Sequence, residues 1–111
     1  MNKTVSLTEN RVFKRIYARG NSLANNLLVI YFSKNGLNIN RLGITVNKKI
    51  GKAVVRNRVR RLIKESYRLK EDFIKENYDV IFVARVRAQD ASYREISGAM
   101  KNLLKRVELY K

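Results

Sequence analysis

The sequence predicts a single α/β domain, an α+β two-layer sandwich in which a small sheet of about three to four strands packs around a central basic helix. Two observations carry this prediction. Three segments repeat apolar residues at helical spacing, and three others are short β-branched and aromatic runs. The chain has 111 residues, 45% of them apolar, which is enough for one domain with its own core. We therefore expect one domain over residues 1–111, in the order helix, strand, strand, helix, strand, helix.

The first helix is expected over Thr8–Arg19. Thr8 is a residue type that caps helix N-termini, and Gly20 is a common stop residue after a helix end. Within the helix, apolar residues form two pairs at one-turn spacing, turned about 100° from each other around the axis. The pairs are Val12 with Ile16, which we expect to face the core, and Phe13 with Tyr17.

Two strands are expected next, over Leu27–Ser33 and Arg41–Asn47. An Asn-Gly dipeptide at positions 35–36 marks a turn between them, so the short connection predicts an antiparallel hairpin. Side chains alternate between the two faces of a strand, so Tyr31 and Phe32 should point to opposite sides of the sheet.

A long basic helix is expected from Gly51 or Lys52 into the low seventies. At about 100° per residue from Val55, its apolar positions gather between roughly −40° and +80° and form a core stripe. The stripe consists of Val55, Val59, Leu62, Ile63, Ser66 and Leu69. The opposite face is polar and basic and consists of Arg56, Asn57, Arg60, Arg61, Lys64 and Arg68, with Arg58 on the flank of the stripe.

The clearest strand is Tyr78–Val86. Because a long helix separates it from the preceding strand, we expect the two strands to run parallel. The last helix is expected to begin at Ser92, which has the spacing of a capping box with Glu95. Its core stripe consists of Ile96, Ala99, Met100, Leu103, Leu104 and Val107.

The composition excludes several classes of function. The chain has 25 Lys and Arg against 9 Asp and Glu, a net charge of +16, and neither Cys nor His. A disulfide framework, a thiol nucleophile, a zinc-thiolate site and a Ser-His-Asp triad are therefore excluded. Between Lys48 and Lys70 lie ten basic residues and one acid, a net +9. With so few acids to pair with, this segment indicates nucleic-acid binding more than a solvated charged face.

The strongest motif lies at the start of the basic helix. The run Lys48-Lys49-Ile50-Gly51, followed by Ala53-Val54-Val55-Arg56-Asn57-Arg58 and Arg60-Arg61-Leu62-Ile63, resembles the protein component of bacterial ribonuclease P. The resemblance extends over almost the whole chain. It includes Phe13 and Tyr17 before Gly20, Ala24-Asn25 before the first strand, the strand beginning at Tyr78 and the last helix.

The resemblance implies a function and a fold detail. The family's enzyme removes the 5′ leader of precursor tRNA by phosphodiester hydrolysis, and its catalyst is a large RNA that uses metal ions. The implied partners are that RNA and precursor tRNA, with no membrane and no small-molecule substrate. We therefore expect no catalytic residue or metal ligand on this chain, and Mg²⁺ bound mainly by the RNA. The family also implies a left-handed crossover around the central helix.

The resemblance and the basic run together assign site residues. Residues expected to bind the catalytic RNA are Lys48, Lys49, Lys52, Arg56, Asn57, Arg58, Arg60, Arg61 and Lys64. Phe13, Tyr17 and Tyr31 resemble the lining of the family's leader-binding cleft, and aromatic rings of this kind stack unpaired bases. Core packing is the alternative for Phe13. Two residues depart from the family pattern: Tyr17 replaces a common Phe, and Asn47 replaces a common Ser.

Other functions are weighed against this one. The chain could be a ribosomal or general RNA-binding protein with no role in cleavage. If the basic helix reached Glu76, three carboxylates on one face could hold Mg²⁺ in a nuclease site, although surface pairing with Arg61, Arg68 or Lys75 is favoured. The three are Glu65, Asp72 and Glu76.

Membrane association is the least favoured of these alternatives. The core stripe of the basic helix is aliphatic and of core width, which argues against a role at a membrane surface. No segment approaches the roughly 20 apolar residues of a membrane span, and the first nine residues contain no apolar signal-peptide region. The cytoplasm is therefore the expected compartment.

Overall fold

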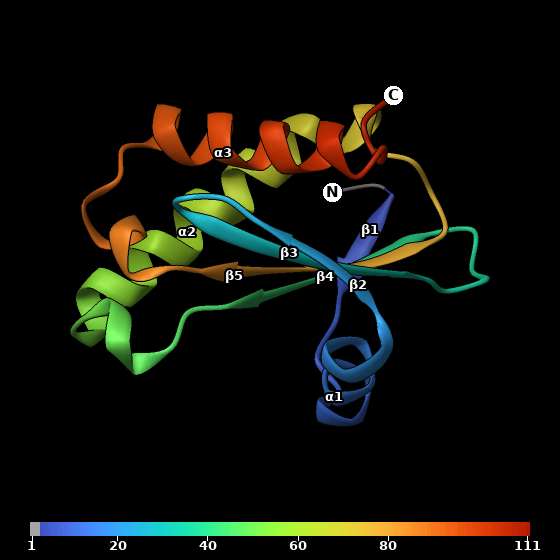
Figure 1. The fold of residues 1–111 in the computed structure, drawn as a ribbon, viewed down its shortest axis with the longest axis horizontal. Coiled ribbons are helices and arrows are strands. Elements are labelled where there is room, and N and C mark those ends of the chain that lie inside the picture. The colour runs from blue at the N-terminus through green and yellow to red at the C-terminus, as the bar shows by residue number, and fades with distance from the viewer. Residues whose placement is uncertain (1–2) are drawn as a thin grey trace.

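The computed structural model describes residues 3–111, which form a five-stranded sheet with helices on both faces (Figure 1). The strands are β1 (Thr4–Ser6), β2 (Asn21–Ala24), β3 (Leu28–Lys34), β4 (Asn40–Thr45) and β5 (Tyr78–Ala84). The helices are α1 (Asn10–Arg19), α2 (Ala53–Lys70) and α3 (Tyr93–Arg106). Three short 3₁₀ turns are η1 (Lys48–Ile50), η2 (Glu71–Phe73) and η3 (Val86–Asp90). The mixed α+β class is confirmed, and the short edge strands β1 and β2 were not predicted.

The sheet has the order β1-β4-β5-β3-β2, with the last strand in the chain at its centre. The predicted parallel pairing of β4 with β5 is confirmed, whereas the predicted hairpin of β3 with β4 is wrong. β5 lies between these two strands and runs antiparallel to β3. Neighbouring strands lie about 4.8 Å apart, so residues 35–39 need to span only about 10 Å to pass the end of β5. The Asn-Gly dipeptide predicts a turn, but it carries no information on whether a strand later in the sequence inserts between the two strands that it connects.

Alternation along β5 divides the apolar residues between two cores. Val80 and Phe82 face the layer formed by α2 and α3, where the larger core lies. Ile81 faces the opposite side and packs against Val12 and Ile16 of α1, as predicted for that pair. Figure 1 shows the same arrangement, with α2 and α3 over one face and α1 under the other. Because α1 is the one helix within residues 3–111 on its side of the sheet, part of that sheet face is left uncovered.

The buried stripe of α2 differs from the predicted stripe at one edge. Leu69 is 54% exposed, while Tyr67 and Lys70, which were not predicted to be buried, lie in the interior. The hydroxyls of Tyr67 and Thr4 share a buried 3.0 Å hydrogen bond that joins α2 to β1. Lys70 Nζ donates to Ser66 Oγ at 3.0 Å. Tertiary contacts with β1 and α3 therefore select a face of α2 that is rotated from the most apolar one.

The end of α1 matches the prediction better than its start. The helix begins at Asn10 with Glu9 as N-cap and without a side-chain capping bond, so the predicted cap at Thr8 is wrong. Leu7 N still donates to Leu42 O at 2.8 Å, which keeps the chain extended beyond β1. Gly20 follows the helix with φ −75°, so no left-handed turn is involved. A Cβ atom there would lie 2.6 Å from Ile16 O, which excludes any larger residue.

The start of α3 is as predicted. Ser92 Oγ accepts from Glu95 N at 3.1 Å, and Glu95 Oε1 accepts from Ser92 N at 2.9 Å. Hydrogen bonding to Ser92, chiefly the bond donated by its backbone N–H, lowers the pKa of the Glu95 carboxyl. The predicted stripe faces the core, with Ile96 and Met100 fully buried.

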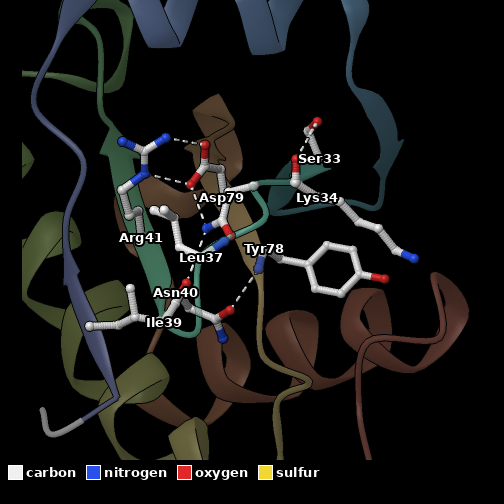
Figure 2. Close-up of polar contacts among 9 residues, drawn as sticks. Ser33, Lys34, Leu37, Ile39, Asn40, Arg41, Tyr78 and Asp79 are labelled. Carbon is white, nitrogen blue, oxygen red and sulfur yellow. Dashed lines mark hydrogen bonds and ion pairs between the residues drawn. The ribbon is translucent and has the colours of Figure 1, made fainter.

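A network of polar side chains fixes the connection between β3 and β4 (Figure 2). Asn35 Nδ2 donates to Ile39 O at 3.1 Å and to Asp79 Oδ1 at 3.0 Å. Asn40 Oδ1 accepts from Tyr78 N at 2.9 Å. The connection is therefore tied directly to the first residues of β5, the strand that it passes.

Candidate nucleic-acid interface

The structure brings together the three aromatic residues predicted to bind the leader. The ring centroids of Phe13 and Tyr17 are 6.1 Å apart, and those of Tyr17 and Tyr31 are 4.8 Å apart in an edge-on arrangement. The hydroxyls of Tyr17 and Thr45 share a 2.8 Å hydrogen bond. The cluster therefore joins α1 to β3 and β4 on the partly covered face of the sheet, while Phe32 packs against the core on the other face, as predicted.

A shallow groove of about 360 Å³ lies beside this cluster. Its lining residues are Asn10, Phe13, Lys14, Tyr17 and Thr45. Tyr17 is 39% exposed, so its ring is accessible, whereas Phe13 is half-buried. The groove thus offers aromatic surface next to the exposed cation Lys14, the combination that binds an unpaired base and its phosphate.

Gly43 determines where the Phe13 ring lies, and it was not among the predicted site residues. A Cβ atom at Gly43 would lie 2.6 Å from Phe13 Cζ and 3.2 Å from Ile81 Cγ1. The ring therefore packs directly against the backbone of β4. A glycine inside a strand often marks such a close approach, and this was the available signal.

Two of the lysines predicted to bind the catalytic RNA, Lys48 and Lys49, lie between β4 and α2, and we call the segment that holds them the basic loop. β4 ends at Thr45, and Asn47 then caps η1 by accepting from Lys49 N at 3.1 Å. The capped turn leaves the side chains of Lys48 and Lys49 exposed. Asn47 thus performs a capping role, as a Ser in that position could. Thr45, which hydrogen-bonds Tyr17, is the last residue of β4 and precedes the loop lysines by only three to four positions.

The residues of α2 and its N-cap that were predicted to bind RNA divide into two groups. Lys52, Asn57, Arg61 and Lys64 are exposed, while Arg56, Arg58 and Arg60 are half-buried. Arg60 Nη1 donates to Asn57 Oδ1 at 3.2 Å, so these two side chains lie together. Arg56 Nε is buried without a hydrogen-bond partner among the described residues.

Arg58 makes contacts that differ from those of the other arginines. Its Nη2 donates to Ala91 O at 2.7 Å and its Nη1 to Gln89 O at 3.4 Å. These bonds attach α2 to the segment that follows β5. In the free protein Arg58 is therefore a structural link as well as a cation.

Two further cations lie near the basic loop and were not predicted. Arg85 Nη1 donates to Asn25 O at 2.7 Å, and Arg87 is exposed on η3. Both line a cleft of about 480 Å³ together with Asn26, Asn47, Lys49, Ile50, Ala84 and Val86. They lie far from Lys49 in the sequence, and the parallel pairing of β4 and β5 brings their strand ends together.

The three carboxylates considered as a metal site are not gathered on one helical face. α2 ends at Lys70, before Asp72 and Glu76. Glu65 accepts from Arg68 Nε at 3.0 Å, which lowers its pKa, and Asp72 pairs with Lys3 at 3.4 Å. The predicted surface pairing is therefore confirmed for Glu65. Within residues 3–111, no three acidic side chains lie close enough together to hold a metal ion.

None of the helices in the described part of the chain combines the length and apolar character that a membrane span requires.

Comparison with known proteins assigns a family. The family model described as Ribonuclease P matches residues 1–108. The ribonuclease P protein component of Clostridium botulinum (strain Langeland) is 50% identical over 109 residues, covering 97% of this chain and 98% of the relative. That of Clostridium novyi is 52% identical over 112 residues, covering 99% of each.

Solved structures agree with the sequence relatives. The ribonuclease P protein of Staphylococcus aureus superposes with a TM-score of 0.88 at 34% identity, covering 96% of this chain and 97% of that one. The protein from Thermotoga maritima has a TM-score of 0.84 at 33% identity, with 91% and 96% covered.

The fold and the clustered cations define a small basic α+β protein of the RNA-binding class. The chain belongs to the ribonuclease P protein family, as the sequence motif indicated. It is therefore a protein component of a tRNA-processing endoribonuclease complex.

Proposed function

We propose that this subunit binds the catalytic RNA of ribonuclease P and the 5′ leader of precursor tRNA, and promotes removal of the leader. The observation that carries the proposal is the hydrogen bond between Tyr17 of the aromatic cluster and Thr45, because Thr45 ends β4 and lies two residues before Asn47, which caps the basic loop. In this proposal the active site is on the RNA, which also holds most of the Mg²⁺, and the protein supplies binding and positioning.

The geometry of the groove favours a single strand for the leader. A volume of about 360 Å³ beside Phe13 and Tyr17 accommodates a base but not a duplex. Stacking on such rings contributes about 1–3 kcal/mol per base and depends little on sequence. Lys14 lies in the same groove and would neutralise a leader phosphate. Mature tRNA has no leader, so this contact distinguishes substrate from product.

The catalytic RNA would bind where the cations are exposed. The capped turn at Lys48 and Lys49 leads into α2, whose first N–H groups favour phosphate and whose Arg61 and Lys64 face solvent. If the catalytic RNA binds next to the groove that holds the leader, the scissile bond of the precursor takes a fixed position relative to that RNA. Such positioning is how a subunit without catalytic groups raises a cleavage rate.

Reconstitution with a bacterial ribonuclease P RNA tests the proposal. At low Mg²⁺, adding the protein should raise kcat/KM for precursor tRNA, and it should tighten binding of precursor more than of mature tRNA. Leu37→Ala, an exposed substitution on the connection between β3 and β4, is the control and should behave as the unaltered protein. RNA binding without stimulation would favour a general RNA-binding protein. Cleavage by the protein without RNA would indicate a protein nuclease.

A further inference from the structure

A second aromatic and basic surface lies at the far end of the molecule from the basic loop. We call it the distal patch, and it consists of Phe73, Lys101, Lys105 and Tyr110. The rings of Phe73 and Tyr110 are stacked, with centroids 5.8 Å apart and 20° between their planes. Phe73 is 52% exposed, so much of its ring is available to a partner.

Two lysines of α3 supply positive charge to the distal patch. The Nζ atoms of Lys101 and Lys105 lie 5.7 and 5.8 Å from the centroid of Tyr110. Neither lysine forms an ion pair with another residue of the described range. The carboxylate of Asp72, next to Phe73 in sequence, is already paired with Lys3. Both ammonium groups are therefore available to an external anion.

The distal patch is held by ordered backbone. Ile74 and Tyr110 form an antiparallel bridge, Lys75 N donates to Leu109 O at 2.8 Å, and Lys111 N donates to Phe73 O at 2.6 Å. Ile74 and Leu109 are buried, so these neighbours anchor the segment in the core. The exposed Phe73 ring is therefore presented on a fixed support.

The location of the distal patch separates it from both surfaces already described. The 18 residues of α2 place its two ends about 27 Å apart, with the basic loop at one end and η2 at the other. Figure 1 shows the C-terminus beside the last turn of α2, in the layer of α2 and α3. The aromatic cluster with Tyr17 lies on the opposite face of the sheet.

We propose that the distal patch binds an unpaired segment of the catalytic RNA, with a base stacked on Phe73 and neighbouring phosphates on Lys101 and Lys105. Exposed rings beside unpaired cations are the combination that binds single-stranded nucleic acid. The patch lies in the same layer as α2, whose basic face is proposed to bind the catalytic RNA. The groove proposed to bind the leader lies on the opposite face of the sheet. The inference rests on the proposed function, because it needs assembly with that RNA.

Photo-crosslinking in the assembled enzyme identifies the RNA that is bound. Phe73→p-benzoylphenylalanine, reconstituted with catalytic RNA and precursor tRNA, should form an adduct with an unpaired stretch of the catalytic RNA. The same substitution at Leu37 is the control and should form none. An adduct with precursor tRNA, or no RNA adduct in an active enzyme, would overturn the proposal.

Affinity measurements test whether the contact contributes to assembly. Phe73→Leu keeps an apolar side chain without an aromatic face, and should weaken binding of the catalytic RNA about tenfold, while Phe73→Trp should preserve it. Lys101→Gln with Lys105→Gln should also reduce the salt dependence, by a slope of about 1–2. If the folded variants kept both the affinity for the catalytic RNA and its salt dependence, the RNA-binding role of the distal patch would be refuted, and the proposed function would not be affected. Failure of the unaltered protein to assemble would refute the proposed function itself.

Discussion

Arg41 and Asp79 lie directly opposite each other on the parallel strands β4 and β5, and two hydrogen bonds of 2.7 Å join their side chains. Burial alone would raise the pKa of Asp79. The hydrogen bonds from Arg41 and Asn35 and the charges of Arg41 and Arg15 outweigh burial, so the pKa lies below its ordinary value. This pair links the central strand β5 to β4, the strand that leads into the basic loop.

Asp79→Asn should therefore destabilise the protein and flatten its response to acid. Leaving Arg41 without its charged partner should lower the free energy of unfolding by about 3 kcal/mol at pH 7. A carboxylate with a lowered pKa stabilises the fold above the ordinary value of about 3.9, and this contribution is lost as the pH falls through the folded-state pKa. Urea unfolding at pH 7, 4 and 2.5 measures both effects.

The matched control for Asp79 is the exposed pair of Glu65 with Arg68. Glu65→Gln removes a carboxylate that also bonds an arginine, but in solvent, so little stability should be lost. Equal destabilisation by the two substitutions would show that the buried position of Asp79 is not what matters.

Gly43→Ala should disturb the groove proposed to bind the leader, because it would displace the Phe13 ring. The new methyl group would collide with the ring at 2.6 Å, and the strain should cost about 1–3 kcal/mol and weaken binding of precursor tRNA. Gly98→Ala is the matched control, because a Cβ atom there meets nothing within 4 Å and lies in the interior of α3. That substitution should raise stability by about 0.5–1 kcal/mol without changing affinity. The opposite ranking of the two variants would refute the assigned role of Gly43.

Substitutions at Tyr17 separate the ring from the hydroxyl. Tyr17→Ala removes the stacking surface and should weaken precursor binding about tenfold while leaving mature tRNA unaffected. Tyr17→Phe loses only the exposed 2.8 Å hydrogen bond with Thr45, so its affinity should stay close to that of the unaltered protein. Binding titrations with both tRNAs measure this difference. Equal losses for precursor and mature tRNA would instead indicate a role in folding.

Replacing the arginines of α2 should separate those that only bind RNA from Arg58, which also stabilises the fold. The triple substitution of Arg56, Arg60 and Arg61 with Ala should weaken assembly with the catalytic RNA and reduce the salt slope by about 2–3. Arg58→Ala should also lower the free energy of unfolding, by about 1–2 kcal/mol, because Ala91 O loses its donor.

The readouts for the arginine variants are filter binding across a range of salt concentrations and urea unfolding. Lys34→Ala is the control for loss of one exposed charge away from α2. If the triple variant bound as tightly as the unaltered protein at moderate salt, this face would not be the RNA-binding surface. If Arg58→Ala unfolded as the unaltered protein does, its hydrogen bonds would have no structural importance.

Local signals in the sequence predicted those features that depend on near neighbours. The capping box of Ser92 and Glu95 lies within one turn, and the spacing of Val12 and Ile16 reports one helical face. The parallel pairing of β4 and β5 followed from the long helix between them. The aromatic cluster was predicted through the family resemblance, and the structure then supplied the contact of Tyr17 with Thr45.

Features that depend on distant contacts were not accessible in this way. Periodicity placed Leu69 in the core, but packing against α3 and β1 selected Lys70 instead. The structural hydrogen bonds of Arg58 were not predicted, because the carbonyl groups that accept them, those of Gln89 and Ala91, lie more than 30 positions away. Arg87 was missed because only the folded sheet brings it near Lys49.

The central place of β5 also governs when the sheet can form. β3 and β4 are synthesised first, yet they do not pair with each other and must leave a gap between them. Only after Ala84 is available can the parallel and antiparallel ladders close on both sides of β5. Contacts of such long sequence separation slow folding, so assembly should be late and concerted. A nascent chain that ends before Tyr78 would display the basic helix without the sheet that positions it.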